Sequence, residues 1–481
     1  MSSHAGALWR RIRAACSERW RAMTSRSEPA FLHSLGSELV EHRQWADRVV
    51  VLAYATVTGL AVVGFTLLSE LASHAAATVR AIGSVGLWAM LVWTPALTVA
   101  ILWWTRRFAP GTAGSGIPQV VRALDEVEGS VARRVLVSPR VAIEKICLVS
   151  GGLLAGLSIG REGPTVQVGA GIMVHARHWL SPRSRIDEHD LMVAGAAAGI
   201  AAAFNTPLGG IVFALEQLTR RRGIVHSTLV IAAIVLAGLV AVAVFGNETY
   251  FGRLGVQSLS WSMLGPGLLV ALVCGVAGGL FARLLVTSAR GGAGRLDAWR
   301  RAHPFRFAAA CAAAVAVIGL VTAGQTAGAG YAPTRALLEG QSDMPGIYTL
   351  LKFCATWLSA WTGVPAGVFA PSLAIGAGIG HDVATWTGVG REAAIPLIAL
   401  GMVGFLAAST QGPITAFIIV MEMVAGQSMV LSLMACAMVS AGVSRLLSPP
   451  MYNELASLLV PPEPRPPAPQ QPADAQTVAR P

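Results

Sequence analysis

The segment "GREGP" at residues 160–164 places an arginine and a glutamate between glycines in an otherwise apolar part of the chain. A carboxylate in such surroundings is costly, and by default it indicates a functional site. The proline two residues later suits the first turn of a helix, where its missing N–H group is not needed. The segment therefore predicts a helix that begins inside the protein, with Glu162 at the positive end of the helix dipole.

The composition around this segment indicates a membrane protein. Of the 481 residues, 54% are hydrophobic and only 13% are charged, whereas a soluble protein has about 25% charged residues. Stretches of roughly 20 apolar residues cross a bilayer as helices. In this chain they are 46–72, 84–104, 141–159, 228–245, 264–288, 306–323 and 428–447. We therefore expect an all-α polytopic membrane domain over residues 46–457.

The basic residues indicate the orientation of the chain. Arginines are concentrated in residues 1–45, before the first apolar stretch. Such an excess predicts a cytoplasmic N-terminus, and the arginines at 220–222 and 295–301 mark further cytoplasmic loops. The proline-rich tail at 458–481 cannot form a packed core, so we expect it to be disordered, and we place it in the cytoplasm as well.

Two other kinds of partner are not expected. The net charge of +11 could suggest nucleic acid, but the charge follows the membrane topology and no recognition motif accompanies it. The six cysteines are scattered along the chain. They lack the spacing of a disulfide framework or a metal site, and we expect neither a metal nor a cofactor.

The two halves of the chain repeat each other. Gly195, Pro207 and Glu216 recur 206 positions later as Gly401, Pro413 and Glu422, and Gly160, Pro164, Gly169 and Gly171 recur 207 positions later as Gly367, Pro371, Gly376 and Gly378. A weaker echo pairs "GSGIP" at 114–118 with "GAGYAP" at 328–333. We predict a duplicated unit, with halves at about 46–247 and 262–457 joined near 246–262. Broken helices at matching places in two halves indicate a transport site at their interface.

Shorter apolar stretches flank the repeated prolines. Residues 191–203 and 207–218 are separated by "FNTP", and residues 400–410 and 413–424 by "QGP". At about 1.5 Å per residue, a helix of twelve residues covers only about 18 Å, which is less than the thickness of a bilayer. We therefore expect half-helices that meet inside the protein.

Three glycine–proline motifs share one physical logic: "GSGIP" (114–118), "GREGP" (160–164) and "GVFAP" (367–371). Glycine permits close approach of the backbone, and the helix that follows exposes unpaired N–H groups at its positive end, which suits an anion. A bilayer tolerates irregular backbone only where it lines a cavity. One motif alone would indicate a simple helix break, but three together predict a shared cavity for an anion.

Side chains in these motifs have functional and structural interpretations. Ser115 would add a hydroxyl donor to the cavity, or it could bond its own helix. Phe369 could contribute a backbone N–H and an apolar wall. Glu162 could occupy the anion site and leave it when protonated, which would admit the permeant ion; alternatively, it could form a structural ion pair with Arg161 or another cation.

Two other functional classes compete with an anion pore. The stretch "GLSIG" at 156–160 matches the G-x-S-x-G pattern of a serine nucleophile, but that pattern needs a preceding strand, whereas we expect Ser158 to lie in an apolar helical run. We expect Ser158 to permit close helix contact, alongside Gly152, Gly156 and Gly160. A cation-coupled transporter of another solute would need a cage of carboxylates, and intramembrane carboxylates are few.

Together, the three motifs, Tyr452 in "PPMYNELA" and the stretch "GAAAGIAAAFNTPLGGIVFALEQ" at 195–217 resemble the CLC family of chloride channels and chloride/proton antiporters. The resemblance covers roughly residues 45–457. It implies two inverted-topology repeats and a homodimer with a separate pore in each subunit. The short tail resembles prokaryotic-type members without CBS domains.

The resemblance also implies roles for single residues. The hydroxyls of Ser115 and Tyr452 would hold a central chloride, Glu162 would be the external gate, and Ser115 resembles the serine of chloride-preferring members. The implied anion-binding set is Ser115, Gly116, Gly163, Val368, Phe369 and Tyr452.

One position departs from the family pattern. In family antiporters the segment resembling "IVFALEQ" commonly ends in two acidic residues, and the second passes protons to the cytoplasm. Here Glu216 is followed by Gln217, and an amide cannot relay a proton by ionising. Either the protein is channel-like, or protons use water or another group such as Glu216. Gln217 could equally be a plain polar residue at a helix end.

Overall fold

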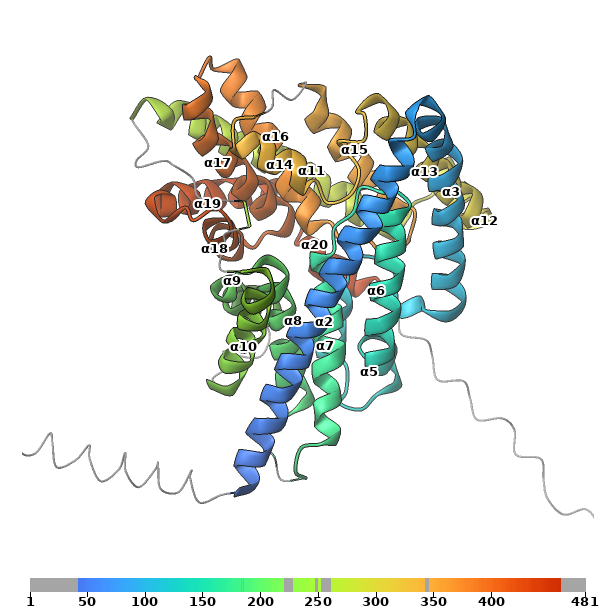
Figure 1. Ribbon diagram of the computed structural model, residues 1–481, viewed down its shortest axis with the longest axis vertical. Helices are drawn as coiled ribbons and strands as arrows, with labels where there is room; N and C mark the ends of the chain where they lie inside the picture. Colours follow the sequence, from blue (N-terminus) through green and yellow to red (C-terminus); the bar gives the residue numbers. More distant parts are fainter. Residues whose placement is uncertain are drawn as a thin grey trace, which may run out of the picture.

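The structure is a computed structural model, and it describes residues 42–182, 184, 186–219, 228–246, 250–251, 261–341 and 346–459. These residues form an all-helical protein (Figure 1). The helices are α2 (His42–Arg80), α3 (Gly83–Phe108), α4 (Ile117–Asp125), α5 (Val131–Leu136), α6 (Pro139–Leu154), α7 (Glu162–Val174), α8 (Glu188–Phe204), α9 (Pro207–Phe213), α10 (Thr228–Phe245), α11 (Leu264–Arg290), α12 (Arg295–Ala302), α13 (Pro304–Val321), α14 (Tyr331–Leu338), α15 (Ile347–Trp361), α16 (Phe369–Trp386), α17 (Arg391–Thr410), α18 (Pro413–Met423), α19 (Val430–Leu447) and α20 (Met451–Ser457). Short helical turns are η1 (Pro110–Thr112), η2 (His175–His178), η3 (Ala214–Leu218), η4 (Trp261–Met263) and η5 (Gln427–Met429).

Seven helices of the described chain are long and apolar enough to cross a membrane. They are Trp45–Arg80, Gly83–Phe108, Thr228–Phe245, Leu264–Arg290, Pro304–Val321, Ala393–Thr410 and Gln427–Leu447. Two expectations were wrong. The stretch 141–159 does not form one continuous helix, because α6 ends at Leu154 and Gly156 then turns the chain with a φ of +81°. Residues 400–410 are no half-helix but the end of the 20-residue α17, whose beginning was hidden by the polar "RE" at 391–392 and by Pro396.

The breaks that separate the shorter helices lie where the sequence predicts them. Asn205 and Gln411 both adopt left-handed backbone, with φ of 57° and 53°, and end α8 and α17. Pro207 and Pro413 then begin α9 and α18, which are shorter apolar helices that do not reach across a bilayer alone.

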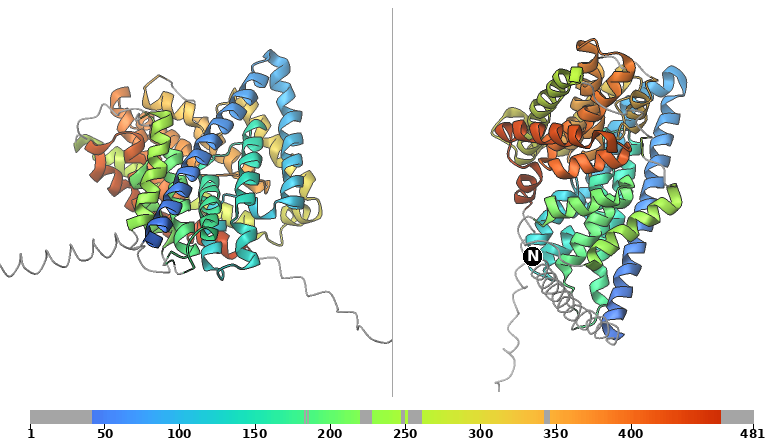
Figure 2. Two further views of the ribbon diagram at one scale, coloured as in Figure 1. Left: turned by 60° about the horizontal axis from the view of Figure 1, so that its bottom comes forward. Right: turned by 90° about the vertical axis from the view of Figure 1, so that its left-hand side faces the viewer.

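The second half of the chain repeats the order of elements in the first. The series α2, α3, α4, α6, α7, α8, α9 and α10 corresponds to α11, α13, α14, α15, α16, α17, α18 and α19, and α20 follows as an addition. In Figure 1 and in the right-hand view of Figure 2, the orange and red helices α16 to α19 lie above the green helices α8 to α10, and α18 packs against α9. Helix α2 begins at His42, four residues before the predicted start of the membrane domain. Most of the predicted joint at 246–262 and all of the tail beyond Leu459 lie outside the described residues.

Equivalent glycine pairs bring helices into backbone contact in both halves. Gly169 of α7 faces Gly195 of α8, and a Cβ on either would collide with the carbonyl oxygen of the other. Gly376 of α16 and Gly401 of α17 make the same contact. The repeated glycines therefore seat α7 and α16 tightly against their neighbours, and both of these helices begin at the site described below.

Candidate anion site

The structure brings the three glycine–proline motifs together. Gly160 and Gly367 exchange two backbone hydrogen bonds, with N···O distances of 2.7 and 3.1 Å. Gly114 is joined to the segment before Gly367 in the same way: its N–H donates to Val364 O at 3.4 Å, and its carbonyl accepts from Ala366 N–H at 3.1 Å. These bridges bind segments from both halves of the chain side by side.

Three helices begin at these bridged segments. Helix α4 follows Gly116, whose φ of +107° only glycine adopts readily. Helix α7 begins at Glu162 and α16 at Phe369. A Cβ on Gly116 would lie 2.7 Å from Gly163 O, so the starts of α4 and α7 are in direct contact. The positive ends of three helix dipoles therefore meet in one buried region.

Two hydroxyl groups in this region have no hydrogen-bond partner among the described residues. Ser115 Oγ and Tyr452 Oη are buried and hydrogen-bond to no described protein group. They lie far apart in the sequence, but α20, which carries Tyr452, packs against α4. Buried hydroxyls normally find a partner, so this pair suits an anion that accepts two hydrogen bonds.

Of the backbone N–H groups predicted to bind the anion, that of Phe369 has no acceptor within its helix, whereas that of Gly116 already has one. The first hydrogen bond of α16 runs from Ser372 N–H to Val368 O at 3.0 Å, so the N–H of Phe369 precedes the helical pattern and has no acceptor within its helix. The Phe369 ring packs on Phe204, with centroids 5.4 Å apart. Gly116 differs, because its N–H donates to Gln119 Oε1 at 2.8 Å. That amide is engaged within α4.

Glu162 is fully buried at the start of α7. Its Oε1 accepts a hydrogen bond from the Tyr331 hydroxyl, and its Oε2 has no hydrogen-bond partner among the described residues. The nearest cation is the adjacent Arg161, with Nε 3.7 Å from Oε1. The carboxylate is therefore held mainly by a single neutral hydroxyl, in a region that favours negative charge.

Arg161 is directed mostly toward other groups. Its guanidinium bonds Tyr250 Oη at 2.9 Å, Thr66 O at 3.2 Å and Glu70 Oε1 at 3.3 Å. The guanidinium also lies over the Tyr331 ring, 5.7 Å from its centroid. Arg161 therefore lies closer to these three groups than to Glu162, and an ion pair between Arg161 and Glu162 is the longest of these polar contacts.

Tyr331 also belongs to the candidate site, although no motif in the sequence indicates it. The available signal was the weak echo between "GSGIP" and "GAGYAP", which marks the beginning of α14 as the counterpart of the beginning of α4. The echo gives the place of a helix start. It does not say that a side chain there reaches Glu162, 169 positions earlier in the chain.

Two buried lysines support the corresponding loops of the two halves. Lys145 Nζ donates to the carbonyls of Thr112 and Gly114, both at 2.7 Å. Lys352 Nζ donates to Thr326 O at 2.9 Å and Gly328 O at 2.8 Å. Each lysine therefore holds the chain just before a helix that contributes to the site, α4 in one half and α14 in the other.

Glu216 caps a helix of the opposite half. Its carboxylate accepts the N–H groups of Ile414 at 3.1 Å and Thr415 at 2.7 Å, at the beginning of α18. Glu422, its counterpart in the repeat, accepts the N–H groups of Leu208 at 3.3 Å and Gly209 at 2.8 Å, at the beginning of α9. The halves thus exchange carboxylate caps.

Gln217 lies beside this cap. Its side chain is 8% exposed and packs against Gly412, where a Cβ would collide with its Nε2. That nitrogen donates to no described protein group. The position is therefore nearly closed to solvent, and its amide has spare hydrogen-bonding capacity.

Ser158 has the surroundings of a packing residue. Its hydroxyl lies 2.9 Å from Thr356 Oγ1, and its N–H donates to Ser359 Oγ at 3.1 Å. It follows the end of α6 in irregular backbone, because Gly156 has already turned the chain, and does not lie in a helical run as expected. Both partners, Thr356 and Ser359, are hydroxyl-bearing residues, and neither can act as a general base.

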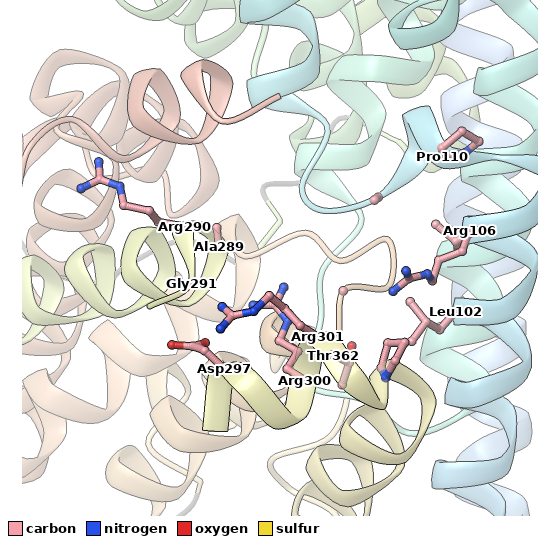
Figure 3. A pocket seen from close by; sticks show the side chains of 14 residues that line it. Leu102, Arg106, Pro110, Ala289, Arg290, Gly291, Asp297, Arg300, Arg301 and Thr362 are labelled. Atoms are coloured by element: carbon pink, nitrogen blue, oxygen red, sulfur yellow. The ribbon is translucent and has the colours of Figure 1, made fainter. Parts of the chain in front are cut away.

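A cavity of about 650 Å³ adjoins the loop that carries Ser115. Ala113 and the pair Thr362–Gly363 contribute to its wall, and so do arginines from α3, α11 and α12. Figure 3 shows Arg106 pointing across this space toward Arg300 and Arg301.

Comparison with known proteins agrees with this arrangement. Residues 97–445 match the family described as voltage gated chloride channel. The chain is 30% identical over 412 residues to the H(+)/Cl(−) exchange transporter ClcA of Vibrio parahaemolyticus, covering 80% of this chain and 85% of the relative. It is 28% identical over 392 residues to ClcA of Citrobacter koseri, with 76% and 79% covered.

Solved structures share the fold at lower sequence identity. A slow cyanobacterial Cl⁻/H⁺ antiporter aligns with a TM-score of 0.71 and 22% identity, over 86% of this chain and 97% of that one. A CLC-type fluoride/proton antiporter aligns with a TM-score of 0.69 and 21% identity, over 86% and 99%. These likenesses show the same helical architecture.

Proposed function

Because the chain belongs to the voltage gated chloride channel family, also called CLC, we propose that it moves chloride across a membrane in exchange for protons, with Glu162 as the gate. The family comprises anion transporters and not enzymes, and its members are multi-pass membrane proteins. The convergence of three helix starts on one buried region, with a carboxylate at one of them, is the observation that carries this proposal.

The site residues support a simple cycle. A chloride ion accepts hydrogen bonds from Ser115 Oγ, Tyr452 Oη and the N–H groups at the start of α16, and the dipoles stabilise its charge. The deprotonated Glu162 carboxylate competes for the same positive region at the start of α7. When Glu162 takes up a proton it loses its charge, withdraws from that region and leaves the path open to chloride. Gly163 would present its backbone to an ion in the outer part of the path.

Tyr331 stabilises the closed state in this scheme. Its hydroxyl donates to the Glu162 carboxylate, and such a bond to an ionised group is worth roughly 1.5–3 kcal/mol. Because the donor comes from α14 in the second half of the chain and Glu162 lies in the first, the closed gate connects the two halves.

The proton path in this proposal does not use an ionisable group at position 217. Gln217 cannot titrate, and the Glu216 carboxylate is engaged by the first N–H groups of α18. Protons would reach Glu162 from the inner side through water. The same two observations favour a second candidate function, a passive chloride channel gated by Glu162.

One experiment separates these two functions. The purified protein is reconstituted in liposomes with an outward chloride gradient, and chloride and proton electrodes record both ions simultaneously. Uphill proton movement driven by chloride is expected for the exchanger. Brisk chloride flux without proton movement would establish the channel, and absence of chloride flux would overturn both.

We also propose that two copies of the chain pair in the membrane, each with its own pore, and that the N-terminus and the tail face the cytoplasm. The family resemblance supports pairing, and the arginine distribution supports the orientation. Single-molecule photobleaching of labelled protein in liposomes would count the copies. One bleaching step per particle at full labelling would contradict pairing.

A further inference from the structure

The arginine-lined cavity has a charge pattern that the chloride site does not explain. Its wall carries Arg106 from the end of α3, Arg290 from the end of α11, and Arg300 and Arg301 from α12. Asp297 is the acidic residue among its lining. A volume of about 650 Å³ is far more than one chloride needs and lies within the usual range of small-molecule sites.

Three of the four arginines in this cavity are not paired with a carboxylate of the described chain. Arg290 is paired with Glu454 at 2.8 Å. In contrast, Arg106, Arg300 and Arg301 form no ion pair with any described residue, and the Asp297 carboxylate instead accepts the Gly292 N–H at 2.8 Å. Three guanidinium groups therefore face one space without a counter-charge within pairing distance.

Two of these side chains are nevertheless held in place. An Nη of Arg300 donates to Ser288 O, and an Nη of Arg301 donates to Gly292 O at 2.9 Å. Backbone carbonyls orient the guanidinium groups without cancelling their charge. Burial is the main cause that lowers the pKa of Arg300; Asp297 raises this pKa and Arg106 lowers it further. The mutual repulsion of Arg106 and Arg300 would be relieved by an anion between them.

From this geometry we propose that the cavity binds a multivalent phosphate oxyanion, and that its occupancy restricts chloride flux. Guanidinium groups bind phosphate through paired N–H donors, and several of them around one space favour a ligand with more than one charge. The ligand is either a soluble polyphosphate or phosphate ester, or the headgroup of an anionic lipid.

The position of the cavity explains the effect on chloride. Ala113 and Gly363 line the cavity. The residues that follow them, Gly114 and Val364, are hydrogen-bonded to each other at 3.4 Å, and Ser115 comes next. A ligand in the cavity thus lies against the loop that carries a chloride-binding hydroxyl. The arginines at 295–301 place this side in the cytoplasm, so the effector would act from within the cell.

Binding is tested first without transport. Isothermal titration of the purified protein with sodium tripolyphosphate is expected to give saturable binding. The double variant Arg106→Gln/Arg300→Gln should weaken it by at least about tenfold, because each lost charge-assisted hydrogen bond contributes strongly to affinity. The matched control Arg107→Gln/Arg295→Gln removes the same charge from α3 and α12 outside the cavity lining and should change affinity by less than about twofold.

A second variant keeps the test decisive if the double variant does not fold. Arg106 hydrogen-bonds no described group, so Arg106→Glu should fold and still weaken tripolyphosphate binding, with Arg107→Glu as its control. The proposal is overturned if wild-type protein shows no saturable binding, or if cavity and control variants bind equally well.

The flux arm rests on the proposed function and identifies the source of the phosphate. Chloride efflux is recorded from neutral phosphatidylcholine liposomes with tripolyphosphate on both sides, and separately from liposomes containing phosphatidic acid without tripolyphosphate. Inhibition in the first assay indicates a soluble ligand, and inhibition in the second indicates a lipid headgroup; each supports the proposal only if Arg106→Glu removes it. Equal inhibition of Arg106→Glu and Arg107→Glu would overturn it. If no preparation moves chloride, the proposed function fails and the titration still decides the binding site.

Discussion

At the scale of single residues, the Glu162 carboxylate combines complete burial, one hydroxyl partner and a position at the start of α7. A charged group at this point is stabilised by the helix dipole, and a neutral one is not. In the proposed cycle, the protonation of Glu162 therefore decides whether its carboxylate already occupies the positive region. Tyr331 adds a preference for the occupied state.

The amide variant Glu162→Gln tests the gate. Because glutamine cannot lose a proton, we expect its chloride flux in liposomes to be nearly independent of pH between 4.5 and 7.5, whereas wild-type flux should rise as the pH falls. Proton movement coupled to chloride should disappear. The measurement is efflux by a chloride electrode over that pH series. A pH dependence equal to that of wild type would remove Glu162 from the gating role.

The variant Tyr331→Phe removes the hydroxyl that holds the gate. We expect chloride flux at neutral pH to rise by about tenfold, because a hydrogen bond to a charged group contributes at least about 1.5 kcal/mol. The pH dependence should persist because Glu162 is unchanged. Tyr348→Phe is the matched control: that hydroxyl is also buried in the second half of the chain, but it bonds no described group. Equal flux in the two variants would show that the Tyr331 hydroxyl does not stabilise the closed state.

At the scale of helices, backbone contact and exchanged caps determine where the site helices lie. The glycine pairs let α7 pack on α8, and α16 on α17, without intervening side chains. Glu216 and Glu422 each stabilise the beginning of a short helix from the other half. Both features occur at equivalent positions in the two halves, so a substitution in one half should lower stability about as much as the equivalent substitution in the other.

Gly169→Ala tests the contact between α7 and α8. The added Cβ would meet Gly195 O, and we expect unfolding free energy to fall by about 1–3 kcal/mol, the usual cost of overpacking. Thermal unfolding in detergent provides the measurement. Gly64→Ala in α2 is the control, because its Cβ would meet no heavy atom within 4 Å. Equal Tm values for both variants would contradict a close backbone contact between α7 and α8 at Gly169.

The variants Glu216→Ala and Glu422→Ala test the exchanged caps. Each leaves two helix N–H groups without an acceptor, and we expect both to lower the unfolding free energy by a similar amount, about 0.5–2 kcal/mol. Paired chloride and proton recordings complete the test. If Glu216→Ala abolished proton coupling without loss of stability, Glu216 would be a proton carrier, and its role as a cap would be secondary.

At the scale of the whole molecule, the candidate anion site forms only where the two halves meet. The bond between Gly160 and Gly367, the contact of Tyr331 with Glu162 and the packing of α20 on α4 all join residues from different halves. Neither half contains a complete set of ligands. In the proposed function the duplication is therefore needed for the site as well as for the architecture, since each half supplies helix starts that the other lacks.

Dividing the chain tests this dependence. We expect residues 1–255 and 256–481, produced together as separate chains, to assemble and transport chloride in a Glu162-dependent way. Either half alone should be inactive, because it lacks part of the site. Liposome efflux of the co-purified halves, compared with each half alone, is the measurement. Glu162-dependent flux from residues 1–255 alone would show that the second half is dispensable.

The sequence by itself determined the membrane class, the CLC family and the three helix starts. These depend on composition and on local backbone rules: glycine for unusual dihedrals, proline for a first turn, apolar runs for lipid. The two helix boundaries that the sequence did not reveal were also hidden by local features. Pro396 and two charged residues concealed the beginning of α17. The apolar stretch continues to residue 159, but α6 ends before the turn at Gly156.

Only the tertiary structure decided which side chains meet. Tyr331 reaches Glu162 across 169 positions, Glu216 caps a helix 198 positions away, and the arginines of α3 and α12 face one cavity. Such contacts arise from the packing of the two halves against each other. No periodicity or motif in one segment encodes the distance to a partner in another, so the ligands of the gate and the cavity emerge only when the helices are placed in space.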